Sequence, residues 1–82
     1  MRPKESAANI VTVDFAAHGR WFLAEGPANF FRLADEYPEA TKYGRREASR
    51  VAVEARDVWE EAAAVRIYTN YGYTDERYVE IL

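Results

Sequence analysis

The chain has 82 residues, the length of one small domain, and 15% of them are aromatic, so it is composed like a folding chain rather than a disordered one. Its formal net charge is −3, which argues against a general nucleic-acid binder because such proteins usually carry a basic surplus. It has no cysteine, which excludes disulfides and Cys-based zinc sites.

The N-terminal residues 1–8 mix Pro3, Lys4 and Glu5 without a pattern, so we expect a flexible leader followed by a single domain over residues 9–82. The first ten residues contain no apolar run typical of a signal peptide. No stretch approaches the roughly 20 apolar residues of a membrane span. We therefore expect a cytoplasmic protein with no membrane partner.

The segment from residue 9 to residue 15 alternates its side chains with the period of two that predicts a β-strand. His18 and Gly19 then supply a tight turn, because glycine permits a positive φ. Residues 20–25 are expected to return as the second strand of a hairpin.

A two-residue loop at this turn places Phe15 opposite Phe22. The resulting core face consists of Val11, Val13, Phe15, Phe22 and Ala24. Trp21 and Leu23 then lie on the opposite, mixed face of the sheet.

Residues 28–37 have two interpretations. Pro27 can open a short helix that ends before Pro38. Alternatively, the two adjacent phenylalanines, Phe30 and Phe31, begin a third strand after the Gly-Pro turn, and we favour this because phenylalanine is β-prone.

The stretch "RREASRVAVEARDVWEEAA", residues 45–63, predicts the main helix. Its apolar stripe, spaced by three and four residues, consists of Ala48, Val51, Ala52, Ala55, Trp59 and Ala62. The small alanines would let this helix lie close to a sheet, with Trp59 as a core anchor at its end. Glu47–Arg50 and Arg56–Glu60 are spaced to form ion pairs on the outer side.

Basic residues gather where this helix begins, although the helix dipole disfavours cations there. The candidate anion-contacting residues are Lys42, Arg45, Arg46 and Arg50. An acidic protein patch or a phosphate backbone would fit them. We favour the simpler explanation of a solvated surface, compensated by acidic residues just upstream.

The C-terminal stretch "IYTNYGYTDERYVEIL" predicts a second hairpin with four tyrosines. Only one register parity opposes apolar with apolar side chains. It pairs the residues as Val65 with Ile81, Ile67 with Val79, Arg66 with Glu80, and Tyr68 with Tyr78. Tyr71 and Tyr73 flank Gly72 at the tip of the loop.

These tyrosines are candidates for a binding surface on the sheet face that the helix leaves open. The proposed partner-binding residues are Tyr68, Tyr71, Tyr73, Tyr78, Trp21 and Arg66. Tyrosine is also β-prone, so the tyrosines can equally serve only to stabilise the hairpin.

No catalytic signature accompanies these elements. His18 is the single histidine, and the chain has no P-loop, no HExxH and no spacing typical of a Ser-His-Asp triad. We expect neither an enzyme nor a metal or other cofactor.

The order strand–strand–(strand)–helix–strand–strand, with "YGRREASRVAVEA" leading into the helix, resembles small phage and mobile-element proteins of the anti-CRISPR kind. It is also similar to a bacterial domain of unknown function with one helix on a sheet. The expected fold is α+β, an antiparallel sheet of four to five strands with one main helix on one face.

The resemblance implies an inhibitor that binds a component of a host defence complex, such as a CRISPR-Cas component, and blocks it sterically. Two alternatives remain: a nucleic-acid-binding accessory protein and a homodimerisation module. The sequence leaves the oligomeric state open.

Overall fold

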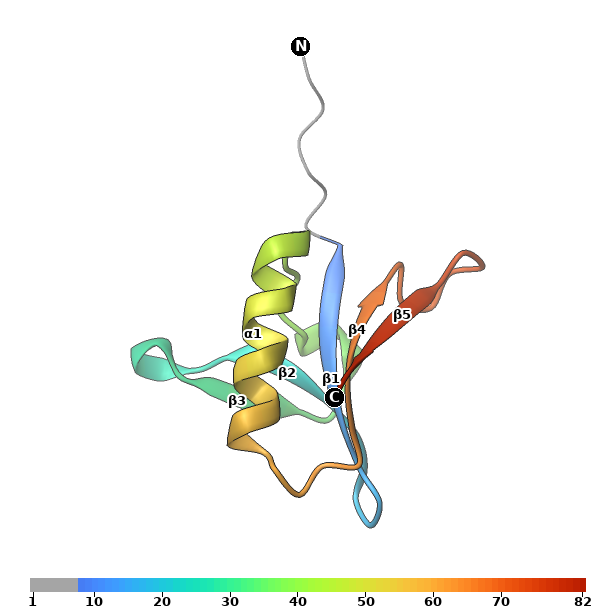
Figure 1. Ribbon diagram of the computed structural model, residues 1–82. Coiled ribbons are helices and arrows are strands. Elements are labelled where there is room, and N and C mark those ends of the chain that lie inside the picture. The colour runs from blue at the N-terminus through green and yellow to red at the C-terminus, as the bar shows by residue number, and fades with distance from the viewer. Residues whose placement is uncertain (1–7) are drawn as a thin grey trace.

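The computed structural model describes residues 8–82, apart from the side chain of residue 29, so the predicted leader falls outside the described residues except at Ala8. One five-stranded antiparallel sheet carries one main helix on one face, which confirms the expected α+β fold (Figure 1). The elements are β1 Asn9–Phe15, β2 Gly19–Glu25, β3 Phe31–Ala34, α1 Arg45–Val58, β4 Ala64–Thr69 and β5 Arg77–Ile81. The strand order is β3-β2-β1-β4-β5.

The ambiguous third segment is a strand, as we favoured. Short 3₁₀ turns, Pro27–Asn29 and Tyr37–Glu39, lie on either side of β3. Proline occupies the first turn of each, where its missing N–H costs no helical hydrogen bond. Each turn is too short to become the alternative helix.

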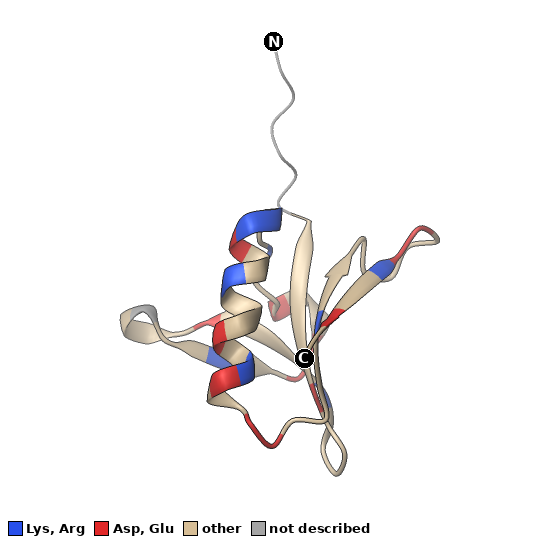
Figure 2. Ribbon diagram, viewed as in Figure 1, with Lys and Arg blue, Asp and Glu red and all other residues tan. Residues whose placement is uncertain are grey.

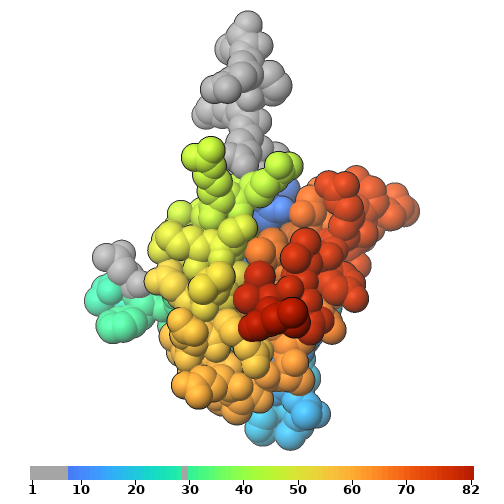
Figure 3. All heavy atoms as spheres, viewed as in Figure 1, coloured from blue at the N-terminus to red at the C-terminus, as the bar shows by residue number. Residues whose placement is uncertain are grey.

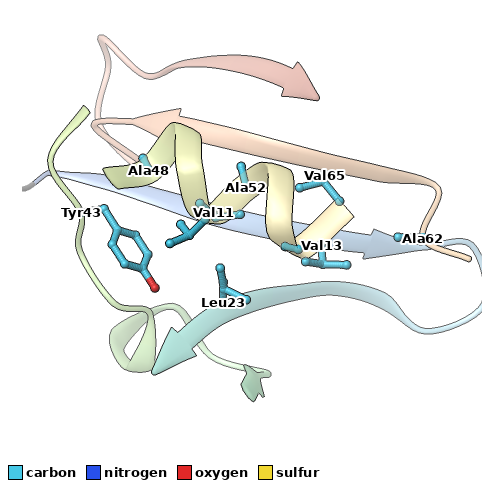
Figure 4. Packing of buried hydrophobic residues seen from close by; sticks show 10 residues of the cluster. Val11, Val13, Leu23, Tyr43, Ala48, Ala52, Ala62 and Val65 are labelled. Carbon is cyan, nitrogen blue, oxygen red and sulfur yellow. The ribbon is translucent and has the colours of Figure 1, made fainter. Parts of the chain in front are cut away.

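Helix α1 packs through alanines, as its stripe predicts. Its buried residues are Ala48, Val51, Ala52 and Ala55. Small side chains let the helix axis approach β1 and β4, and Figure 4 shows Val11, Val13 and Val65 filling the space beneath it. The helix ends at Val58, earlier than predicted, and the Trp59 N–H donates to the Ala55 carbonyl. The Trp59 ring still packs, partly buried, against this core.

The predicted register of the first hairpin is wrong. The strands pair Phe15 with Gly19, Asp14 with Arg20, and Val13 with Trp21. The loop between them has three residues, 16–18, and Gly19 takes the positive φ of +78°. This changes the parity of β2, because a shift by an odd number of residues turns every side chain to the other face.

The changed parity exchanges the faces of two large side chains. Leu23 lies fully buried under α1, while Phe22 lies on the opposite face with Ile10 and Tyr68. We call the side turned away from α1 the distal face. Trp21 pairs with Val13 and so lies on the helix face, not beside the tyrosines as predicted.

The register of the second hairpin is confirmed at all four predicted pairs. Ile67 pairs with Val79 and Val65 with Ile81, and on the distal face Arg66 pairs with Glu80 and Tyr68 with Tyr78. In Figure 1 this hairpin extends beyond the edge of α1.

Within residues 8–82, no helix is long and apolar enough to cross a membrane.

Candidate protein-binding surface

Aromatic rings form a continuous cluster on the distal face. Tyr68 lies at its centre, with its ring centroid 5.2 Å from that of Tyr78 and 5.0 Å from that of Tyr71. The Tyr71 ring also contacts Phe22 at 5.5 Å and Tyr37 at 5.0 Å. These separations lie within the roughly 4.5–7 Å at which aromatic pairs attract. Five chain segments, namely β2, the turn after β3, β4, the loop after β4, and β5, are thus joined through one set of rings.

Tyr71 is the residue whose position the sequence misplaced. We expected it at the loop tip, but it folds back onto the distal face and packs with the second apolar cluster. The backbone reverses around it, because Asn70 has a φ of +58° and Gly72 a φ of +86°. Asparagine and glycine tolerate this left-handed region better than other residues do. The ring of Tyr71 therefore covers Tyr68.

The four tyrosines of this hairpin differ sharply in exposure. Tyr68 is only 4% exposed, so it supports the cluster from below and offers almost no surface. Tyr78 is 55% exposed and Tyr73, at the loop, is 70% exposed. Tyr71 lies between these extremes. Of the predicted binding tyrosines, Tyr73 and Tyr78 offer the most surface to a partner.

Beside the rings, charged side chains form a chain of ion pairs across four strands. Asp14 accepts two hydrogen bonds from Arg20, at 2.8 and 3.0 Å, and one from Arg66 at 2.9 Å. Arg66 also donates to Glu80 at 3.2 Å. The hydrogen bond to Asp14 raises the pKa of Arg20, although partial burial acts in the opposite direction. Both guanidinium groups are therefore held in fixed positions.

The arginines also lie over the rings. The Arg20 guanidinium is 4.9 Å from the centroid of Tyr68, and that of Arg66 is 5.0 Å from the centroid of Tyr78. Cation–π contacts of this length are attractive. The Arg20 Nη1 also donates to the Tyr71 hydroxyl at 3.5 Å. We call the combined set the distal surface: Arg20, Tyr37, Arg66, Tyr68, Tyr71 and Tyr78.

Three members of this arrangement were missed by the sequence reasoning. Asp14 and Arg20 become neighbours only in the observed hairpin register. Tyr37 lies in the 3₁₀ turn after β3, and the sequence of this turn has neither the periodicity of a strand nor that of an α-helix. Opposite charges close to a turn were the available signal for the first pair.

Trp21 and His18 are neighbours at the first hairpin. The Trp21 indole N–H donates to the His18 carbonyl at 3.1 Å. Since Trp21 lies on the helix face, the structure does not bring this predicted binding residue together with the tyrosines. Arg66, by contrast, lies among them.

The basic residues near the helix start do not form one patch. Lys42 places its Nζ 4.9 Å from the ring centroid of Tyr37, at the distal surface. Arg50 is bonded to Glu47 and, at 2.8 Å, to Glu54 on the outer side of α1. Arg45 lines a groove beside β5, and Arg46 is exposed on the helix. Figure 2 shows basic and acidic residues alternating along α1.

Among residues 8–82, no three His, Asp or Glu side chains lie close enough to hold a metal ion. His18 is exposed at the turn after β1. The groups that this surface presents to a partner are aromatic rings, tyrosine hydroxyls and guanidinium groups held in position.

Comparisons with models of known protein families, with curated protein sequences and with solved structures gave no match.

Proposed function

We propose that this protein is a non-enzymatic inhibitor that binds a protein partner through its distal surface and blocks that partner sterically. One observation carries the proposal. Stacked tyrosines and two ion-paired arginines occupy the sheet face that α1 does not cover, and Tyr78 is 55% exposed among them.

The composition of this surface suits protein recognition. Tyrosine and arginine are enriched among the residues that contribute most to binding energy at interfaces. A tyrosine supplies a large contact area with few rotatable bonds, so less conformational entropy is lost when it is immobilised. The exposed Tyr73 loop lies close by in the chain and extends the candidate contact area.

The fixed geometry adds to this argument. Asp14 holds Arg20 and Arg66 before any partner arrives. Side chains that are already ordered reduce the cost of binding, which is about 0.5–1.5 kcal/mol for each flexible side chain immobilised. The distal surface is therefore preorganised for a contact.

The proposed partner class follows from the resemblance in size, charge and architecture to anti-CRISPR proteins, and is a component of a CRISPR-Cas complex. Co-purification of the tagged protein with purified Cas complexes, together with an interference assay in cells, tests it. We expect Tyr78→Ala to weaken capture at least tenfold while Val53→Ala, an exposed change on α1, leaves capture unchanged. If no Cas complex is captured and interference proceeds normally, the anti-CRISPR assignment is wrong.

A further inference from the structure

The outer edge of β5 is open to another strand. β5 ends the sheet order, so one side of its backbone has no neighbouring strand among residues 8–82. Natural proteins often blunt such edges with proline or a bulge. β5 contains no proline, and its register with β4 runs without interruption from Arg77 to Ile81. The opposite edge strand, β3, has only four residues and is flanked by proline-containing turns.

A groove runs along this edge on the helix face. It lies between the N-terminal half of α1 and β5 and has a volume of about 690 Å³. Its lining includes Ile67, Val79, Ile81 and the aromatic Tyr78, and Val79 is 63% exposed. In Figure 3, β5 lies beside α1 on the side facing the viewer. Most of the distal surface is on the other face of the same hairpin, and its member Tyr78 also borders the groove.

The charge of the groove is opposite to that of the whole chain. The sequence has 14 acidic and 11 basic residues, yet the charged residues that line the groove are Arg45 and Arg77. No ion pair joins Arg77 to another described residue. An occupant that brings a carboxylate to Arg77 would gain a charge-assisted hydrogen bond.

We propose that β5 and this groove bind an extended, acidic segment of a partner protein, which adds to the sheet as a sixth strand. Backbone hydrogen bonds to β5 hold the segment. Its apolar side chains, at alternate positions, enter the groove over Val79 and Ile81, and a flanking Asp or Glu meets Arg77. The site adjoins the distal surface at Tyr78, but it does not depend on the function proposed for that surface.

A second copy of this chain fits the groove less well. Symmetric antiparallel pairing of two β5 strands about Val79 avoids facing like charges directly, but it places Arg77 of each copy opposite Ile81 of the other. The shared groove would then contain the arginines of both copies and no carboxylate from its lining. An acidic segment would bring carboxylates to these arginines, whereas a second copy would add further arginines that repel them.

The first test pans a phage-displayed library of random linear 12-residue peptides against the folded protein. We expect the enriched peptides to alternate apolar residues and to carry Asp or Glu beside them. Hydrogen exchange of the backbone amides of residues 77–81 should slow when the best peptide is added. Enriched peptides without acidic residues, or protection confined to other strands, would overturn the proposal.

Backbone methylation of the selected peptide then separates strand addition from side-chain binding. Since alternate amides of a strand point toward β5, N-methylation of one alternate set should weaken binding at least tenfold, and of the other set less than threefold. Equal effects of the two sets would contradict strand addition.

Variants locate the site. Arg77→Glu should weaken peptide binding at least tenfold and Arg77→Lys should largely restore it. Tyr37→Ala, which removes a ring of the distal surface that does not line the groove, should leave peptide binding within threefold. If Tyr37→Ala abolishes peptide binding while Arg77→Glu does not, the peptide occupies the distal surface and the groove proposal fails. If the protection of residues 77–81 from hydrogen exchange increases with protein concentration when no peptide is present, a second copy occupies the edge instead.

Discussion

Tyr71 packs edge-on against Tyr68, with the two ring centroids 5.0 Å apart and the ring planes at 89°. The contact closes the loop between β4 and β5 onto the sheet that the loop leaves. It converts Tyr68 from a surface residue of a hairpin into a buried one. Because the same Tyr71 ring contacts Phe22 and Tyr37, it connects the second hairpin to β2 and to the turn after β3.

Removing this ring should therefore cost stability. We expect Tyr71→Ala to lower the free energy of unfolding by about 1–3 kcal/mol, because it exposes the rings of Tyr68 and Phe22 and leaves a gap. Urea denaturation followed by tryptophan fluorescence measures the change. The matched control is Tyr73→Ala in the same loop, which should change stability by less than about 0.5 kcal/mol because Tyr73 is 70% exposed. Equal losses in the two variants would show that the Tyr71 ring does not join the segments energetically.

The second hairpin was predictable in detail because its apolar residues fall on one face only. With Val65 and Ile67 on β4 and Val79 and Ile81 on β5, just one parity places them on the same face, and the structure has that register. The position of Tyr71 was not predictable in this way, since strand periodicity stops where the loop begins at Asn70.

The first hairpin failed for the opposite reason. Strand β2 carries apolar residues on both faces, with Trp21 and Leu23 on one side and Phe22 and Ala24 on the other. Either register could therefore bury two of these side chains, and the alternation of residues along β2 did not discriminate between the two registers. The loop length decided the register, and a glycine at position 19 fits a three-residue loop as well as a two-residue one. The distal surface was misjudged as a consequence, because Phe22 was expected on the core face opposite Phe15 and Trp21 was expected on the face that carries the tyrosines.

Asp14 should contribute more than other acidic residues, because it holds two arginines. We expect Asp14→Ala to lower the free energy of unfolding by about 2 kcal/mol, since hydrogen bonds to charged groups contribute about 1.5–3 kcal/mol and this site is partly buried. Glu39→Ala, which breaks the exposed pair with Arg32, is the control and should cost less than about 1 kcal/mol.

A double-mutant cycle isolates the pair that carries this effect. If Asp14 acts through Arg20, the losses for Asp14→Ala and Arg20→Ala should sum to more than the loss of the double variant, by about 0.5 kcal/mol or more. Additive losses would mean that Asp14 does not act through Arg20, and would leave Arg66 as the partner through which it acts.

Close packing of α1 on the sheet should make enlargement at Ala52 costly. Ala52 is fully buried in the cluster with Val11 and Val65. We expect Ala52→Leu to lower the free energy of unfolding by about 1–3 kcal/mol, because the added carbons must push the helix away from the strands. Val53→Leu, at the next and exposed position, should change it by less than about 0.5 kcal/mol. A neutral Ala52→Leu would mean that the helix can move outward without loss of packing.

Tyr43 should make the fold sensitive to alkaline pH. Its side chain is buried in the main core, and burial raises the pKa of its phenol above the ordinary value of 10.0. Thr41 acts in the opposite direction and lowers this pKa, but burial is the larger effect. The Tyr43 hydroxyl has no hydrogen-bond partner among the described residues. The neutral phenol is the form that the folded state accommodates.

The direction of the pH effect follows. A pKa raised in the folded state contributes stability that is complete below pH 10, the pKa of the unfolded chain, and is lost as pH rises through the folded value. Tyr43→Phe should remove this contribution, so the variant should lose less stability than the parent between about pH 9 and pH 11. At pH 7 it should be as stable or slightly more so, because a buried hydroxyl without a partner is removed.

Urea denaturation at a series of pH values measures both effects. Tyr73→Phe is the matched control, because it removes an exposed phenol from the same protein. Its free energy of unfolding should fall with rising pH as steeply as that of the parent. If Tyr43→Phe keeps that slope as well, the phenol of Tyr43 ionises in the fold at no extra cost and its burial is not what limits alkaline stability. If the variant is destabilised by more than about 1 kcal/mol at pH 7, the hydroxyl has a partner that stabilises it, such as a buried water.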